Sequence, residues 1–201
     1  MGVPIVIGSA YLAGAIPFSN IAARRARGVD LRAVGTGTVS GTSLYKVAGF
    51  VPLAVAGVFD VAKGAVGPVL AGDRPLLAAV AGGVAVVGHD WSPFLRGAGG
   101  RGVAPTLGAL LVNAWPGAVL VLVAMLLGWA TKQTGLGTFI GMVLLVPVLG
   151  ALYGSSGAIA GAAVAAPMFV KRIAGNSRPV ASRAPTYVTR LVFDRDARQQ
   201  A

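Results

Sequence analysis

The sequence contains no cysteine, a single histidine and only 6 acidic residues among its 201 positions. Without cysteine, disulfide frameworks, thiol nucleophiles and cysteine-ligated metal sites are excluded. One histidine supplies too few ligands for a structural zinc site, so such a site is not expected. Charged residues of either sign make up only 11% of the chain, well below their share in soluble domains. The bilayer is therefore the expected solvent for this chain.

Long apolar runs dominate what is present. Apolar residues make up 55% of the chain, and a helix needs roughly 17 to 25 of them in succession to cross a hydrocarbon core about 30 Å thick. Several such runs follow one another with short polar breaks, which predicts an all-α integral membrane protein with about seven short transmembrane helices. The expected helices cover residues 3–22, 47–71, 76–95, 104–113, 115–131, 137–153 and 157–173.

The basic residues set the expected orientation. A net charge of +11 arises from 17 Lys and Arg residues, which cluster in loops at the ends of apolar runs and in the C-terminal tail. Such loops favour the cytoplasm, so the N-terminus is expected outside and the C-terminus in the cytoplasm. Residues 1–173 are expected to form a multi-pass membrane domain whose first helix is retained, and residues 174–201 a basic cytoplasmic tail. This placement argues against nucleic-acid binding.

A first glycine-rich loop lies between Arg32 and Lys46. Residues 35–43 contain three glycines and five hydroxyl side chains. Glycines let backbone N–H groups converge on an oxyanion, hydroxyls donate further hydrogen bonds, and flanking cations neutralise charge. The loop is either an anion-binding element or a flexible polar connector.

A second glycine-rich loop covers residues 97–102 and leads into the short apolar run at residues 104–113. Pro105 suits the first turn of that helix, whose N-terminal amides then face the loop. Ten residues rise only about 15 Å, half of a crossing. Because irregular backbone at membrane depth is tolerated where it lines a polar cavity, this region indicates a second phosphate site. It lacks the spacing of a nucleotide-binding P-loop.

Ionisable groups also lie inside the apolar runs. Asp60 and Lys63 are three residues apart in one expected helix and can share a face, while His89 lies near the end of the next. Charged groups at membrane depth are costly and mark functional sites. The alternative for Asp60 and Lys63 is a structural ion pair, and for His89 a hydrogen-bonded structural role.

Several short motifs occur in order over residues 5–110. They are Gly14-Ala15-Ile16-Pro17-Phe18, Asp30-Leu31-Arg32, Asp60-Val61-Ala62-Lys63-Gly64, Gly88-His89, Phe94-Leu95 and Gly99-Gly100-Arg101-Gly102-Val103-Ala104. This series resembles the bacterial acyl-phosphate:glycerol-3-phosphate acyltransferases, the PlsY family. The resemblance implies transfer of a fatty acyl group from acyl phosphate to the 1-hydroxyl of glycerol 3-phosphate, forming lysophosphatidic acid in the bacterial inner membrane. The implied partners are these two substrates and membrane lipid, without metal or nucleotide.

The resemblance also implies the site. The candidate catalytic residues are Thr36, Lys46 and Arg101. The candidate phosphate-binding residues are Gly35, Gly37, Thr38, Ser40, Gly99, Gly100 and Gly102. Further candidates are Arg32, Asp60, Lys63 and His89.

The sequence departs from the family pattern at several of these positions. Thr36 stands in place of a serine, Lys46 at an arginine position and Arg101 at a lysine position. The family's C-terminal His and Asn are missing, and the nearest counterpart is Tyr187-Val188-Thr189-Arg190-Leu191. A non-catalytic lipid-binding or assembly protein and a small transporter are the alternatives.

Overall fold

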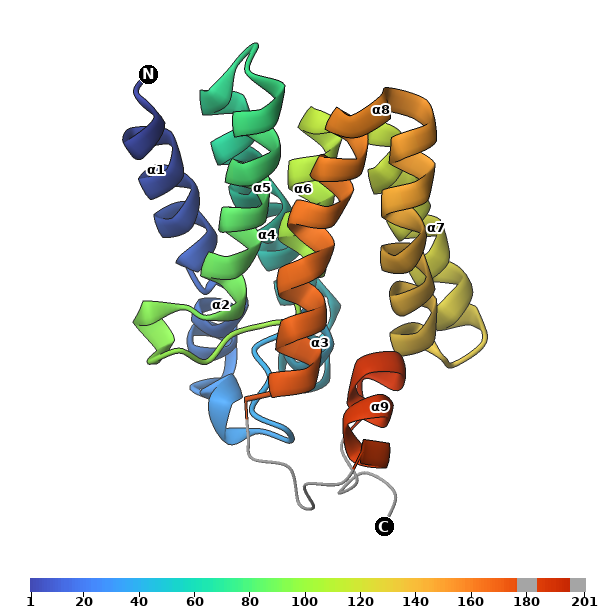
Figure 1. Ribbon diagram of the computed structural model, residues 1–201. Coiled ribbons are helices and arrows are strands. Elements are labelled where there is room, and N and C mark those ends of the chain that lie inside the picture. Colours follow the sequence, from blue (N-terminus) through green and yellow to red (C-terminus); the bar gives the residue numbers. More distant parts are fainter. Residues whose placement is uncertain (177–183, 196–201) are drawn as a thin grey trace.

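The computed structural model describes residues 1–176 and 184–195, and all regular secondary structure in these two ranges is helical. The helices form a bundle with the N-terminus at its upper end and α2, α3 and α9 at its lower end (Figure 1). In chain order they are α1 (Val3–Ala15), α2 (Phe18–Arg27), η1 (Leu31–Ala33), α3 (Gly41–Ala48), α4 (Phe50–Ala71), α5 (Pro75–Asp90), η2 (Pro93–Leu95), α6 (Val103–Asn113), α7 (Trp115–Ala130), α8 (Thr134–Ala174) and α9 (Ala184–Phe193).

The outer surface of the bundle is apolar. Phe50, Val51 and Val58 on α4 and Trp129 on α7 are each at least 68% exposed. The segments Val3–Arg27, Phe50–Ala71 and Thr134–Ala174 are long and apolar enough to cross a membrane, and α6 and α7 are shorter apolar helices. Exposed apolar side chains in this number require lipid as the solvent, so the expectation of an all-α integral membrane protein is confirmed.

A kink divides α8 into two legs. Gly154 has φ 63° and ψ −148°, a conformation that interrupts the helix. The two legs run back along each other (Figure 1), so closely that a Cβ on Gly157 would lie 2.1 Å from the carbonyl oxygen of Leu149. The legs correspond to the separate helices predicted at residues 137–153 and 157–173.

The prediction of one continuous helix over residues 3–22 is wrong, because the structure has two helices there, α1 and α2. The chain breaks between α1 and α2 because Pro17 has no N–H to donate, and the residue before it, Ile16, is extended with ψ 120°. The break leaves helix-end carbonyls to be satisfied inside the bundle. Ser92 Oγ donates to the carbonyl of Ala15 at 2.6 Å, and Lys63 Nζ donates to that of Ile16 at 2.7 Å.

Two further predicted helices have different ends in the structure. The run at residues 47–71 is divided at Gly49, whose φ of 84° ends α3 and precedes α4. The run at residues 76–95 stops at Asp90, because Pro93 cannot continue the helix and starts the 3₁₀ turn η2 instead. Hydrophobic periodicity does not detect such breaks, since the residues around them stay apolar.

Small residues let the helices approach closely. A Cβ on Gly14 would lie 2.2 Å from the carbonyl oxygen of Ala85, and one on Gly108 would lie 1.8 Å from that of Val61. Close approach of this kind is typical of helix packing in membranes. Larger buried side chains fill the space between α6, α7 and α8, namely Leu110, Val121, Met142, Leu145, Leu149, Val164 and Met168.

Candidate active site

The two glycine-rich loops lie against each other at the lower end of the bundle. The first loop is defined here as residues 34–40, because residues 41–43 of the predicted loop already belong to α3. The second loop is residues 97–102. The backbone N–H of Val39 in the first loop donates to the carbonyl of Gly99 in the second at 3.0 Å. Two segments about 60 residues apart in the sequence thus share one site.

Asn176 joins the two loops from a third part of the chain. Its side-chain amide Nδ2 donates to the carbonyls of Gly37 at 3.2 Å and Gly99 at 2.9 Å. Its Oδ1 accepts from the N–H of Gly99 at 3.2 Å. The sequence reasoning missed this residue, because Asn176 follows a helix end marked by Gly175 (φ 64°) and reads there as an ordinary helix stop.

The hydroxyl groups of the first loop contact one another and the start of α3. Thr36 Oγ1 and Thr38 Oγ1 lie 2.9 Å apart, with Thr38 buried and Thr36 half-buried. Ser40 caps the N-terminus of α3, where its Oγ accepts from the N–H of Ser43 at 3.3 Å. Gly35 and Gly37 have φ of 57° and 71°, so the loop takes turns that favour glycine.

The second loop packs on His89. The N–H of Gly100 donates to the His89 carbonyl at 3.2 Å, and a Cβ on Gly100 would lie 2.1 Å from His89 Nε2. A Cβ on Gly99 would lie 2.2 Å from the same His89 carbonyl. Gly102, with φ 71°, ends the loop at the start of α6. The backbone of this loop therefore follows the surface of α5 without room for side chains at two positions.

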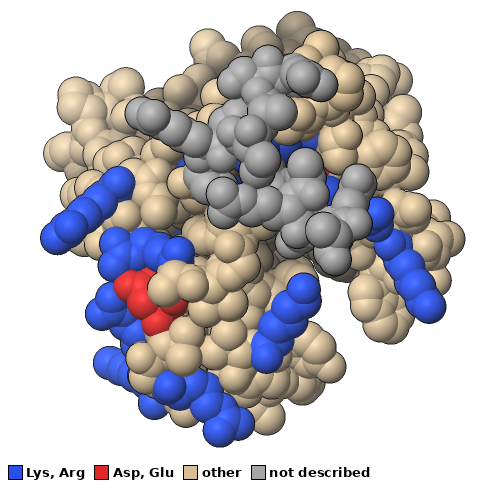
Figure 2. Space-filling view, turned by 90° about the horizontal axis from the view of Figure 1, so that it is seen from below, with Lys and Arg blue, Asp and Glu red and all other residues tan. Residues whose placement is uncertain are grey.

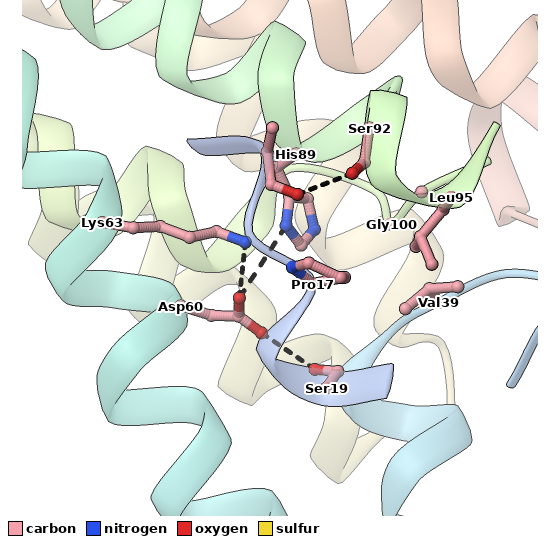
Figure 3. Close-up of a pocket in the computed structure, with 11 residues that line it drawn as sticks. Pro17, Ser19, Val39, Asp60, Lys63, His89, Ser92, Leu95 and Gly100 are labelled. Atoms are coloured by element: carbon pink, nitrogen blue, oxygen red, sulfur yellow. Dashed lines mark hydrogen bonds and ion pairs between the residues drawn. The ribbon is translucent and has the colours of Figure 1, made fainter. Parts of the chain in front are cut away.

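A buried polar cluster lies beneath the loops, with Asp60 at its centre (Figure 3). Lys63 Nζ is 2.6 Å from Asp60 Oδ1, and Ser19 Oγ donates to Asp60 Oδ2 at 2.8 Å. His89 Nδ1 is 4.0 Å from Asp60 Oδ1. The cluster combines residues of α2, α4 and α5, and the expectation that Asp60 and Lys63 share a helix face agrees with this geometry.

The cavity at this cluster is small. It is lined by Asp60, Lys63 and His89 on one side and by Val39 and Gly100 of the two loops on the other. Its volume is about 10 Å³, close to the space that one water molecule needs. Because Lys63 is also the donor to the carbonyl left by the break at Pro17, the geometry favours the structural alternative for the Asp60–Lys63 pair.

Arg32 is engaged with its neighbour Asp30. Arg32 Nη2 lies 2.6 Å from Asp30 Oδ2, and Arg24 pairs with the same carboxylate. The hydrogen bond from Arg32, followed by that from Arg24, holds the pKa of Asp30 well below its usual range. The same hydrogen bond to Asp30 raises the pKa of Arg32. Arg32 Nη1 also reaches the carbonyl of Leu95 at 3.4 Å, which ties η1 to η2.

The two remaining cations lie outside the cavity lining. Lys46 is exposed in the last turn of α3. Arg101 Nε is 2.7 Å from Asp194 Oδ1, and its Nη1 donates to the carbonyl of Lys171 at 3.0 Å. Sequence reasoning did not anticipate that the C-terminal helix would supply a partner to Arg101. Among the described residues, no group of three or more His, Cys, Asp or Glu side chains is placed to hold a metal ion.

The chain is similar to known proteins in sequence. The family model described as glycerol-3-phosphate acyltransferase matches residues 4–181. Glycerol-3-phosphate acyltransferase 4 of Dehalococcoides mccartyi (strain CBDB1) is 38% identical over 156 residues, covering 76% of this chain and 67% of the relative. The glycerol-3-phosphate acyltransferase of Shouchella clausii (strain KSM-K16) is 35% identical over 140 residues, covering 67% of this chain and 68% of the relative.

A solved structure shares the fold. The crystal structure of PlsY (YgiH), an integral membrane glycerol 3-phosphate acyltransferase, in its glycerol 3-phosphate form superposes with a TM-score of 0.76. The identity is 23%, and the match covers 85% of this chain and 88% of that one. Because the family model spans most of the sequence, the chain belongs to the glycerol-3-phosphate acyltransferase family.

Proposed function

We propose that this chain transfers a fatty acyl group from acyl phosphate to the 1-hydroxyl of glycerol 3-phosphate, forming lysophosphatidic acid for phospholipid synthesis. The observation that carries the proposal is the contact between the two glycine-rich loops, in which Val39 donates to Gly99 and Asn176 binds both. Two anion-binding elements side by side suit a reaction in which both substrates carry phosphate. The resemblance in motif order and the family assignment support the same reaction.

The reaction requires little from the protein beyond positioning the two substrates. The hydroxyl oxygen attacks the carbonyl carbon of the acyl phosphate and forms the ester bond. The bond from that carbon to the phosphate oxygen breaks, and inorganic phosphate leaves. A phosphate oxygen of the substrate accepts the hydroxyl proton, so no side-chain base is required. Since acyl phosphate is already activated, orientation of the hydroxyl and stabilisation of negative charge are the main catalytic contributions.

The proposed roles follow from the chemistry of each residue. Thr36 and Thr38 offer a pair of hydroxyl donors on the first loop, and Lys46 offers an exposed cation in the last turn of α3, which follows that loop. Arg101 at the end of the second loop offers a planar guanidinium that suits a phosphate oxyanion. The cluster of Asp60, Lys63 and His89 then supports the loops from the interior of the bundle. The N–H groups of Gly37, Gly99 and Gly100 donate to acceptors within the protein, so the proposed anion site rests on these hydroxyl and cationic side chains.

The proposed setting is the bacterial inner membrane, with several passes and the site facing the cytoplasm. Lys and Arg side chains occupy several places on the lower face of the molecule, which carries the two loops (Figure 2). Basic loops favour the cytoplasmic side, so the N-terminus at the upper end lies outside. Residues 174–201 are proposed as the basic cytoplasmic tail, with α9 within it. Acyl phosphate, glycerol 3-phosphate and membrane lipid are the proposed partners.

The family assignment favours acyl transfer over the two alternatives. A small transporter places its substrate near the bilayer midplane, in a cavity that opens to each side in turn. Here the buried charges Asp60 and Lys63 enclose a cavity of only about 10 Å³. A non-catalytic lipid-binding protein would not need two phosphate-binding loops in contact.

The test is acyl transfer by the purified full chain in lipid, with palmitoyl phosphate as donor, radiolabelled glycerol 3-phosphate as acceptor and palmitoyl-CoA as competing donor. The expected result is lysophosphatidic acid from palmitoyl phosphate and none from palmitoyl-CoA. The Arg101→Ala variant is expected to insert and fold but to form no product. Absence of product from both donors, in wild-type protein shown to be folded, would reject the proposal.

A further inference from the structure

Two buried arginines connect α9 to the lower end of the bundle. Arg172 Nη1 donates to the carbonyl of Leu191 at 2.9 Å and to that of Gly135 at 3.0 Å. Arg190 Nη1 donates to the carbonyl of Ile173 at 3.4 Å. Both arginines are only 2% exposed. The C-terminal helix is thus fixed to both legs of α8 by charged hydrogen bonds to main-chain carbonyls.

Asp194 ends α9 in a conformation that most side chains avoid. Its φ is 52°, and its N–H donates to the carbonyl of Arg190 at 3.1 Å, which closes the helix. Glycine is the usual residue at such a left-handed helix end, because a Cβ is strained there. Asp is one of the few residues besides glycine that adopt this conformation readily, so the helix end places a carboxylate beside Arg101.

The Asp194 carboxylate forms an ion pair with Arg101. Its Oδ1 lies 2.7 Å from Arg101 Nε, while Arg101 Nη1 donates to the Lys171 carbonyl at 3.0 Å. One hydrogen bond and one ion pair therefore hold the guanidinium, with only 11% of the Arg101 side chain and 25% of the Asp194 side chain exposed. Arg101 also interacts electrostatically with the cations Lys171 and Arg172. The Asp194 carboxylate offsets part of this repulsion.

We propose that Asp194 is a positioning residue, which holds Arg101 in place to bind a substrate phosphate. This inference rests on the proposed function, because it concerns the second loop of the same site. Asp194 acts through Arg101 and does not touch the substrate. The hydrogen bond that Arg101 donates to the Lys171 carbonyl and the ion pair with Asp194 together hold the guanidinium, which preorganises it before the phosphate arrives.

The test measures two quantities on the full chain in lipid nanodiscs: the Kd for glycerol 3-phosphate without donor, and turnover with palmitoyl phosphate. Asp194→Asn keeps the size and the left-handed tolerance of the residue but removes its charge. It is expected to raise the Kd by about tenfold or more. Asp194→Glu restores the charge and is expected to stay within about threefold of wild type. Asp73→Asn makes the same chemical change in the exposed turn between α4 and α5 and should alter neither quantity.

Two further variants distinguish weaker binding from loss of folding. Asp194→Gly relieves the backbone strain and removes the carboxylate, so it is expected to unfold no earlier than wild type and still to bind weakly. In an Arg101→Lys background, Asp194→Asn is expected to have little further effect, because lysine lacks the guanidinium Nε group that Asp194 contacts in wild type.

The outcomes separate this inference from the proposed function. Wild-type Kd in both Asp194→Asn and Asp194→Gly would overturn the role of Asp194, whatever the turnover. Binding without any turnover in wild type would reject the proposed reaction, while the Kd values of the variants would still decide on Asp194. A wild-type chain that binds neither glycerol 3-phosphate nor inorganic phosphate would overturn both.

Discussion

Gly100 lies directly against the imidazole of His89, with Nε2 only 2.1 Å from where a Cβ at position 100 would be. The N–H of Gly100 also donates to the carbonyl of His89 at 3.2 Å. The backbone of the second loop can therefore pack against the His89 side chain only when position 100 has no side chain. The path of the loop is set by this contact, and so is the place of Arg101, which follows Gly100 directly.

The first prediction tests this contact with Gly100→Ala. The added methyl group must push His89 aside or lift the second loop, and overpacking of this kind costs about 1–3 kcal/mol. We expect turnover with palmitoyl phosphate to fall by about tenfold or more, because the loop shifts relative to Thr36 and Thr38. Gly57→Ala in α4 is the matched control, since nothing lies within 4 Å of the place that a Cβ at position 57 would take. Equal activity of the two variants would contradict the importance of the contact.

The second prediction concerns the residue that joins the loops. Asn176→Ala removes hydrogen bonds to Gly37 and to both backbone groups of Gly99. Each lost bond costs about 0.5–1.5 kcal/mol, with more where a buried partner stays unpaired. We expect activity to fall more than stability, because the two loops separate while the helices stay packed. Kinetics and thermal unfolding in one detergent would measure both.

Asn113→Ala is the control for that experiment. Asn113 Nδ2 donates to the carbonyl of Ala78 at 3.0 Å, at the end of α6 away from the loops. This variant should lower the unfolding midpoint while retaining turnover. If Asn176→Ala behaves in the same way, the bonds of Asn176 serve stability alone.

Local pattern was sufficient to predict several elements of the fold. Apolar runs predicted α6 and α7 to within about one residue, since both are bounded by helix breakers. The turn at Gly154 lies in the gap left between two predicted helices. The break at Pro17 was also readable, because proline restricts the residue before it. The surrounding apolar run concealed it.

The candidate site was predictable only in part. Glycine and hydroxyl content identified the two loops, and ordered motifs placed them in one site. Asn176 and Asp194 could not be found in this way, because their partners lie 77 and 93 positions away and include main-chain atoms. Side-chain bonds to distant carbonyls leave no periodic signal in the sequence.

The third prediction is a pH effect on stability at Asp30. Its pKa in the folded chain is held low by Arg32 and Arg24, so folding gains stability from the ionised carboxylate. That gain is complete above the unfolded pKa of about 4 and is lost as pH falls toward the folded pKa. We therefore expect Asp30→Asn to lower the unfolding midpoint at pH 7, with a smaller difference from wild type near pH 3. Asp73→Asn should show no such convergence, and a constant difference for Asp30→Asn would exclude the linkage.

The fourth prediction separates structure from chemistry at the buried pair. Lys63 is bonded to Asp60 and to the carbonyl of Ile16, so Lys63→Met leaves the Asp60 carboxylate without its cationic partner and the Ile16 carbonyl without its donor. Breaking such a pair costs about 3–5 kcal/mol, and the unfolding midpoint in detergent should fall clearly. Lys46→Met, the same change at an exposed position, should leave the midpoint unchanged.

The double variant Asp60→Asn/Lys63→Met then decides between the two roles of the pair. Removal of both charges eliminates the unpaired carboxylate, so part of the lost stability should return. If the pair is structural, turnover should recover together with the unfolding midpoint, because the loops regain their support. Recovery of stability with no turnover would instead place Lys63 or Asp60 in the chemistry, where a charge near the substrate phosphate cannot be replaced by packing.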